Sequence, residues 1–316
     1  MASIETTSPA GTQTAAPAKT ATLSGSGQRK LPLGTQLMLQ AICLFITFTV
    51  LFPIAWIVGM SLNPSNVARP KEIFPANPSI KAYEKVIRQP TRNPVSFPEL
   101  ALNSFKLAAG TATLSVLIGV AAAYAFSRFR FMGREQLMLG ILGVLMLPGV
   151  ATIAPLFVTL NKIQLPFLDT SLRDSLWGVG LAMLSGMLPF AVWNLKGYLD
   201  TIPVDLEEAA AIDGATRNQI FVRIILPLST PALAVTGFMG FLGGWTEFYL
   251  SWQFLTHPKD FTLGMALNGM VGQFATTTPW SEFAAMALLI ALPVSIVYLM
   301  IQKYIVSGLT VGGVKG

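Results

Sequence analysis

Six long stretches without a charged residue constrain this chain more than any other feature. Each is long enough to cross the roughly 30 Å hydrocarbon core of a bilayer as a helix. Backbone groups in lipid must pair with one another, and a helix achieves this within a single segment. The pattern predicts an all-α integral membrane protein with six transmembrane helices, near residues 39–61, 105–127, 136–160, 176–196, 229–252 and 283–304. The composition agrees, because only 11% of residues are charged, against about 25% in soluble domains.

A seventh charge-free window, residues 261–281, is not expected to span the membrane. It carries Asn268, Gln273 and three consecutive threonines, and lipid would leave these polar groups without partners. We expect a loop or a short re-entrant turn on the outer side.

The remaining segments divide the chain into parts. Residues 1–36 are small and polar and are expected to form a disordered tail, and residues 309–316 form a second, glycine-rich tail. Residues 62–104 form a long loop with seven prolines, in which 79–88 reads as one amphipathic helix. The loop is either a shaped surface for a soluble partner or a lid over the bundle.

The number of basic residues on each side does not decide how the chain is oriented in the membrane. With these boundaries eleven of the 21 lie on one side and ten on the other, so the positive-inside rule is nearly balanced. The cluster of Arg128, Arg130 and Arg134 favours the cytoplasm for the side that holds both termini. The net charge of +6 is scattered along loops, which suits anionic lipid headgroups and indicates no nucleic-acid partner.

Several catalytic patterns are missing from the sequence. It contains no Gly-x-x-x-x-Gly-Lys-Ser/Thr loop for nucleotide phosphates, no His-Glu-x-x-His and no Gly-x-Ser-x-Gly. His257 and Cys43 are the single histidine and cysteine, so neither a zinc site nor a Cys/His pair is expected. We therefore expect no catalytic residue, no metal and no enzyme activity, and energy must come from another polypeptide.

Residues 201–227 form a charged segment between two apolar ones. Thr201 is expected to be the N-cap of a first helix, which Gly214 ends as a residue that tolerates left-handed backbone. A second helix is expected at 215–225, and Pro227 then begins the next apolar segment. An amphipathic helix-turn-helix in an aqueous loop suits a partner's groove.

This segment resembles the EAA loop of ABC importer permeases at every fixed position: Glu208-Ala209-Ala210, Gly214, Ile224 and Leu226-Pro227. Three further segments are similar to sugar-importer permeases: Asn103-Ser104-Phe105, Ala123-Tyr124-Ala125-Phe126-Ser127-Arg128 and Leu147-Pro148. The last ten residues, 307–316, resemble the tail of the maltose/maltodextrin type. The chain is thus similar, from about residue 37 onward, to carbohydrate-type permease subunits of ABC importers.

The resemblance implies the type I permease fold, with a permease domain at 37–308. It also implies a second permease subunit as heterodimer partner, two ATPase subunits that bind ATP and Mg, and a periplasmic or lipid-anchored sugar-binding protein. This chain would hold no cofactor and would lie in the bacterial inner membrane with both termini cytoplasmic. The implied ATPase-coupling residues are Glu207, Glu208, Ala209, Ala210, Gly214, Ile224, Leu226 and Pro227. The implied tail contacts are Leu309, Gly312, Gly313 and Lys315.

Candidates for a substrate path come from one carboxylate and three aromatic residues. Glu247 lies in the fifth span, where an ionisable group faces a cavity or a partner, or else lies just outside the hydrocarbon. Trp193, Trp245 and Tyr249 could stack on sugar rings or anchor the membrane interface. The alternatives are a permease for another solute, such as glycerol phosphate or another sugar, and a membrane enzyme or scaffold that does not transport.

Overall fold

The computed structural model describes residues 32–312, apart from 71, 167–169 and 274–276. The chain divides into two units, residues 1–51 and 52–316. The described part of the first unit is the start of helix α1 (Leu33–Ser61), which ends in the second unit. The expected tail at 1–36 is therefore too long, since helix begins at Leu33, and the rest of that prediction lies outside the described residues.

The regular elements of the second unit, among the residues that the structure describes, are helices, and the β pairing there consists of one isolated bridge, Gln164 with Ser171. Its helices are α2 (Lys81–Arg88), α3 (Phe97–Arg128), α4 (Arg134–Leu145), α5 (Gly149–Asn161), η1 (Leu172–Asp174), α6 (Leu176–Leu199), α7 (Asp205–Ile212), α8 (Arg217–Ile220), η2 (Phe221–Ile225), α9 (Leu226–Leu228), α10 (Thr230–Trp245), α11 (Tyr249–Phe254), η3 (Pro258–Asp260), α12 (Leu263–Gly269) and α13 (Trp280–Gly312).

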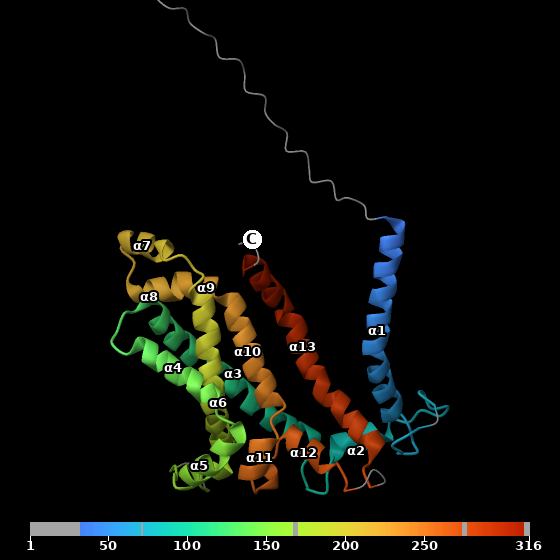
Figure 1. Cartoon of the computed structure of the whole chain (residues 1–316). Helices are drawn as coiled ribbons and strands as arrows, with labels where there is room; N and C mark the ends of the chain where they lie inside the picture. The colour runs from blue at the N-terminus through green and yellow to red at the C-terminus, as the bar shows by residue number, and fades with distance from the viewer. Residues whose placement is uncertain (1–31, 71, 167–169, 274–276, 313–316) are drawn as a thin grey trace, which may run out of the picture. The chain divides into compact units, whose positions relative to one another are not determined.

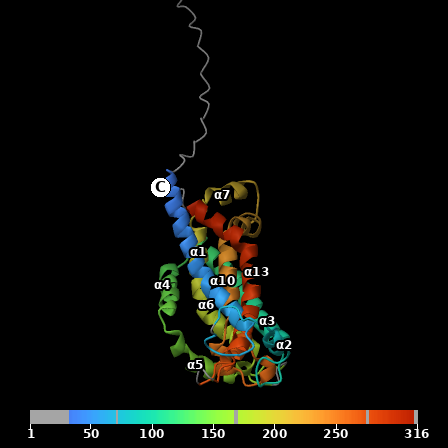
Figure 2. The ribbon, with the colours of Figure 1, turned by 90° about the vertical axis from the view of Figure 1, so that its right-hand side faces the viewer.

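The long helices of this unit form one bundle (Figures 1 and 2). Helix α3 packs against α6 and α10, and α10 also packs against α13. Helices α7 and α8 lie at one end of the bundle, and α2, α5, α11 and α12 lie at the opposite end. The C-terminal end of α13 lies at the same end as α7.

Two glycines let α10 approach α3 closely. A Cβ on Gly244 would lie 2.5 Å from Cα of Ala108, and one on Gly240 would lie 2.9 Å from Cα of Ala112. Both distances are shorter than carbon atoms tolerate, so the small-residue face fixes this helix pair.

The number of membrane spans differs in detail from the expectation. Four helices are long and apolar enough to cross a membrane, and two bent pairs raise the number to six if each pair is one span. The expected span at 136–160 is not one straight helix, because α4 and α5 meet at an angle of 99°. Pro148 explains the break, since its ring disfavours helical backbone at Leu147 and it lacks an N–H.

The expected fifth span at 229–252 is also interrupted. Helix α10 ends at Trp245, and α11 begins only at Tyr249. At its other end, α10 is bent by 75° from the helix Arg217–Leu228. In contrast, the helix at the expected sixth span, α13, is continuous and extends past residue 304 to Gly312.

The proline-rich loop after α1 is attached to the bundle. Its helix α2 lies close to the expected 79–88. Val86 is fully buried, and the Lys85 ammonium lies 2.7 Å from the Glu282 carboxylate at the start of α13. The Tyr83 and Ser61 hydroxyls share a hydrogen bond of 2.8 Å. These contacts favour the interpretation of this helix as a lid.

Asp174 connects the start of α6 to the segment that follows α11. Its carboxylate accepts the Thr256 N–H at 2.8 Å and the Thr256 hydroxyl. His257 Nδ1 lies 3.6 Å from Asp174 Oδ2, and Nη2 of Arg173 lies 3.9 Å from the same oxygen. Burial alone raises the pKa of the Asp174 carboxyl. The hydrogen bonds from Thr256 and the positive charges of Arg173 and protonated His257 outweigh burial, so the pKa lies below its ordinary value of 3.8.

We predict that Asp174→Asn lowers the Tm of the detergent-solubilised protein by about 3 °C at pH 7. A lowered folded-state pKa contributes stability that is present above pH 3.8 and is lost as the pH falls through the folded value. The difference from wild type should therefore shrink below pH 3.8. A difference that persists unchanged at low pH would show that the charge of Asp174 has no such role.

Candidate docking hairpin and candidate transport cavity

The hairpin forms where expected but is capped differently. Gly214, with φ of +86°, joins α7 to the second helix, as its residue type predicts. The expected N-cap role of Thr201 is wrong. Its hydroxyl donates to the Tyr198 carbonyl at 2.7 Å and so closes the end of α6, while Val204 precedes α7 without a side-chain cap.

The second helix begins with a capping box that the sequence reasoning missed. The Gln219 N–H donates to the Thr216 hydroxyl at 3.4 Å, and the Thr216 N–H donates to the Gln219 side chain at 2.8 Å. The signal was present, because Thr-x-x-Gln before an apolar run is typical of a helix start.

Pro227 marks a local change of helix type. The five residues of η2 form a π-helical turn, and the Leu226 N–H bonds the Phe221 carbonyl five residues earlier. Pro227 has no N–H to offer the carbonyl of Arg223, so the regular four-residue pattern cannot continue there. The helix then turns by 75° into α10.

The matched motif residues separate into two groups by burial. Ala210, Ile224 and Leu226 pack inward against a buried cluster at this end of the bundle. That cluster consists of Val120, Ala123, Leu195, Leu199, Ile202, Ile220, Ile225 and Ala232. Glu208 and Ala209 are exposed. Part of the motif therefore fixes the hairpin to the bundle, and part faces outward.

Helix α7 also presents apolar side chains to the outside. Ile212 is 87% exposed, and Val204 and Leu206 are about half exposed. Helix α7 lies at one end of the bundle (Figure 1). Exposed large apolar side chains on a segment that also carries charged residues are typical of a surface for another protein.

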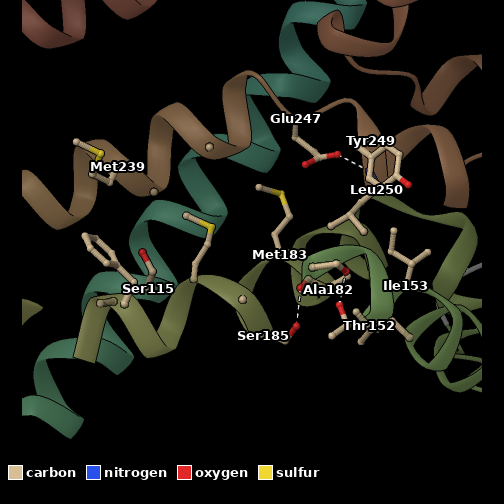
Figure 3. Close-up of a pocket in the computed structure, with 18 of the residues that line it drawn as sticks. Ser115, Thr152, Ile153, Ala182, Met183, Ser185, Met239, Glu247, Tyr249 and Leu250 are labelled. Atoms are coloured by element: carbon tan, nitrogen blue, oxygen red, sulfur yellow. Dashed lines mark hydrogen bonds between the residues drawn. The ribbon is translucent and has the colours of Figure 1, made fainter. Parts of the chain in front are cut away.

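A cavity of about 690 Å³ lies between α5, α6, α10 and α11, with Ser115 contributed by α3. Figure 3 shows Glu247 and Tyr249 at one end, and Met239 and Ser115 toward the other. Glu247 and Tyr249, two of the four candidates, thus line the same cavity.

The two tryptophan candidates do not line this cavity. Trp245 is only 3% exposed. Its indole N–H donates to the Ile290 carbonyl at 3.0 Å, and its ring stacks on Phe241 with centroids 5.8 Å apart. Trp193 is exposed elsewhere on α6. Trp245 is a packing residue between α10 and α13, which corrects its assignment to the path.

Glu247 has a structural role besides its place in the cavity. Its Oε1 accepts the backbone N–H groups of Leu250 at 2.6 Å and Ser251 at 3.4 Å. The carboxylate therefore caps α11 and holds the break between α10 and α11 in place.

Small hydroxyl side chains line the same cavity, and sequence reasoning missed them because they are common in apolar helices. Their hydroxyl protons are directed to backbone carbonyls: Ser115 to Ala112, Thr152 to Gly149 and Ser185 to Ala182, at 2.7–3.0 Å. Their oxygens keep lone pairs that can accept hydrogen bonds from a ligand.

The tail candidates are only partly described. Leu309 and Gly312 belong to the last turns of α13, whereas Gly313 and Lys315 lie outside the described residues. Among those residues, no group of three or more His, Cys, Asp or Glu side chains could hold a metal ion.

Four helices of the described residues are long and apolar enough to cross a membrane, or six if each bent pair is one span, and they define a multi-pass membrane protein. The family model described as "Binding-protein-dependent transport system inner membrane component" matches residues 115–311, and the chain belongs to this family. It is 36% identical to the galactooligosaccharides transport system permease GanQ of Bacillus subtilis over 272 residues, covering 86% of this chain and 93% of GanQ. It is also 36% identical to the maltose/maltodextrin permease MalG of Escherichia coli K12 over 282 residues, with the same coverage.

The fold agrees with solved importers. A bacterial ABC transporter that imports the acidic polysaccharide alginate matches with a TM-score of 0.67 and 24% identity, covering 86% of this chain and 96% of that chain. A second structure, the alginate transporter with a pentasaccharide-bound periplasmic protein, gives a TM-score of 0.60 at 15% identity. The expected ABC importer fold is therefore confirmed.

Proposed function

We propose that this chain is a permease subunit of an ATP-driven importer for an oligosaccharide of the maltodextrin or galacto-oligosaccharide class. The proposal is supported by two relatives with carbohydrate substrates in their names, each matched over nearly the whole of its length. The observation that carries it within this chain is the chemistry of the cavity.

The cavity combines the two surfaces that a sugar needs. Met183, Met187, Met239 and Phe190 supply apolar area, which suits the C–H faces of a pyranose ring. Hydroxyl oxygens and the Glu247 carboxylate supply acceptors for sugar hydroxyl protons. Binding sites of this size, mostly apolar with a few placed polar groups, are typical for small ligands.

The chain depends on partners for energy and delivery. ATP and Mg would bind two ATPase subunits, which dock on the outward side of α7 at Glu208, Ala209 and Ile212. A second permease subunit would complete the pathway, and a periplasmic or lipid-anchored binding protein would deliver the sugar. Closure of the ATPases would move the hairpin and switch the cavity between the two sides of the membrane.

We propose six spans, counting each bent pair as one, with the α7 end in the cytoplasm. Both termini would then be cytoplasmic, in a bacterial inner membrane. The end of α13, with Leu309 and Gly312, and the following Gly313 and Lys315 would contact the ATPase dimer. The C-terminal end of α13 lies at the same end of the bundle as α7, which supports this arrangement.

We predict opposite accessibility for two cysteines introduced in a Cys43→Ala background. Asn218→Cys, in α8, should react with a membrane-impermeant maleimide only after the cells are opened. Arg92→Cys, in the proline-rich loop, should react in intact cells. Labelling of the Asn218 position from outside intact cells would contradict the orientation.

The substrate class is tested by ATP hydrolysis in the complete complex. We expect maltodextrins or galacto-oligosaccharides, presented by the binding protein, to raise hydrolysis about tenfold over the rate without sugar. Glycerol phosphate and amino acids serve as matched non-substrates. Stimulation by glycerol phosphate and not by any oligosaccharide would replace this proposal with its alternative.

A further inference from the structure

Glu207 turns away from the outward side of α7 and contacts the end of α3. Its Oε1 lies 2.5 Å from Nε of Arg128, and the two side chains are 12% and 9% exposed. Its Oε2 accepts the hydroxyl of Tyr124 at 3.0 Å. Both oxygens of this carboxylate therefore have partners on α3.

Arg128 also connects α3 to the segment between α6 and α7. Its Nη2 donates to the Ile202 carbonyl at 3.0 Å, and its Nη1 donates to the Ser127 hydroxyl at 2.9 Å. Ser127 in turn donates to Asp200 at 2.6 Å, and Lys196 pairs with the same carboxylate at 2.6 Å. The attachment of α3 thus involves both sides of the α6–α7 turn.

Aromatic contacts extend the attachment to the second helix of the hairpin. The Tyr124 ring lies 4.9 Å from that of Phe221 and 5.6 Å from that of Phe129, measured between centroids. The Arg217 guanidinium lies over the Phe129 ring at 5.6 Å. The hairpin and α3 consequently form one packed unit.

We propose that Glu207 is a positioning residue that locks α7 to α3, so that movement of the hairpin is transmitted into α3 through Arg128. This proposal rests on the proposed docking of an ATPase on the hairpin. Helix α3 is suited to carry the movement onward, since it contributes Ser115 to the cavity and contacts α10 at Gly240 and Gly244. A hydrogen-bonded, mostly buried ion pair holds α7 and α3 in one relative orientation better than a single contact would.

The two adjacent glutamates of the motif then have different roles. Glu208 is exposed and belongs to the docking surface, whereas Glu207 is held inside this unit. Substitution of Glu208 should weaken ATPase binding. Substitution of Glu207 should leave binding in place and uncouple hydrolysis from transport.

The test compares Glu207→Gln, Glu208→Gln and the exchange Glu207→Arg/Arg128→Glu in the complete complex, with Glu135→Gln as a control. Glu135 is an exposed carboxylate near the start of α4. For Glu207→Gln we expect undiminished co-purification of the ATPase and about a tenfold fall in sugar transported per ATP hydrolysed. The charge exchange should restore part of this ratio, and Glu135→Gln should match wild type.

A second readout does not depend on transport. Hydrogen exchange of the α7 backbone amides should become about tenfold faster in Glu207→Gln, because the helix loses its attachment. A wild-type ratio of transport to hydrolysis in Glu207→Gln would overturn the proposal. So would loss of the ATPase to the same extent as in Glu208→Gln, or unchanged hydrogen exchange. If wild type itself shows no ATP-dependent transport, the proposed function fails. The hydrogen-exchange measurement still tests whether Glu207 attaches α7 to α3.

Discussion

Gly244→Ala is expected to lower the Tm of the protein in detergent by about 5 °C. The added methyl group would lie 2.5 Å from Cα of Ala108 and 2.7 Å from the Thr111 hydroxyl. Neither helix backbone can yield locally, so α10 and α3 must separate along their contact. The expected result is overpacking where the C-terminal end of α10 meets α3.

The neighbouring glycine provides a matched control for this substitution. A Cβ on Gly243 meets the flexible ends of Met187, at 3.5 Å, and of Met183, at 4.0 Å, so Gly243→Ala should leave the Tm unchanged or slightly raised by helix propensity. Thermal unfolding followed by tryptophan fluorescence or by size-exclusion chromatography measures both variants. Equal Tm values for the two variants would contradict the close packing of α3 and α10.

Ile212→Asp is expected to weaken binding of the ATPase about 100-fold. Ile212 is 87% exposed on α7, so the substitution removes nothing from the core of this chain. It would place a carboxylate where the proposed interface excludes water. Co-purification of the ATPase and titration of the purified subunits measure the effect.

The conservative variant Ile212→Val controls for changes in the hairpin itself. It keeps an apolar side chain of nearly the same size and should bind the ATPase within a few-fold of wild type. Full recovery of the ATPase with Ile212→Asp would show that α7 does not provide the docking surface.

Local backbone conformation was predictable from sequence where a single residue type determines it. Gly214 adopts left-handed backbone between two helices, as expected of a glycine after a charged helix. Helix α2 also forms close to its expected position, because its apolar residues recur at helical spacing. The family motif located the hairpin itself without any knowledge of contacts.

Interruptions inside apolar segments were harder to predict. Charge-free windows report only that a segment tolerates lipid, and they say nothing about bends. The window at 136–160 contains the 99° bend between α4 and α5, although Pro148 was a visible signal. Trp245 shows a related difficulty, since an aromatic residue in an apolar helix has the same sequence pattern in a core and in a sugar path.

Contacts between distant residues were beyond sequence reasoning. Arg128 and Glu207 are 79 positions apart, and no sequence periodicity relates the end of α3 to a hairpin that begins only after α6. Cavity hydroxyls such as Ser115 and Ser185 were also missed, because serine is common in apolar helices and only the packing of α3 against α6 brings these two to one cavity.

Sugar uptake by reconstituted proteoliposomes tests the central claim most directly. The complex of this chain with its companion permease and ATPase is placed in vesicles, with the binding protein outside and ATP inside. The account predicts accumulation of labelled maltodextrin or galacto-oligosaccharide that requires ATP and is abolished by Ile212→Asp. Accumulation that is the same without ATP, or that occurs for no carbohydrate while the complex is intact, would contradict it.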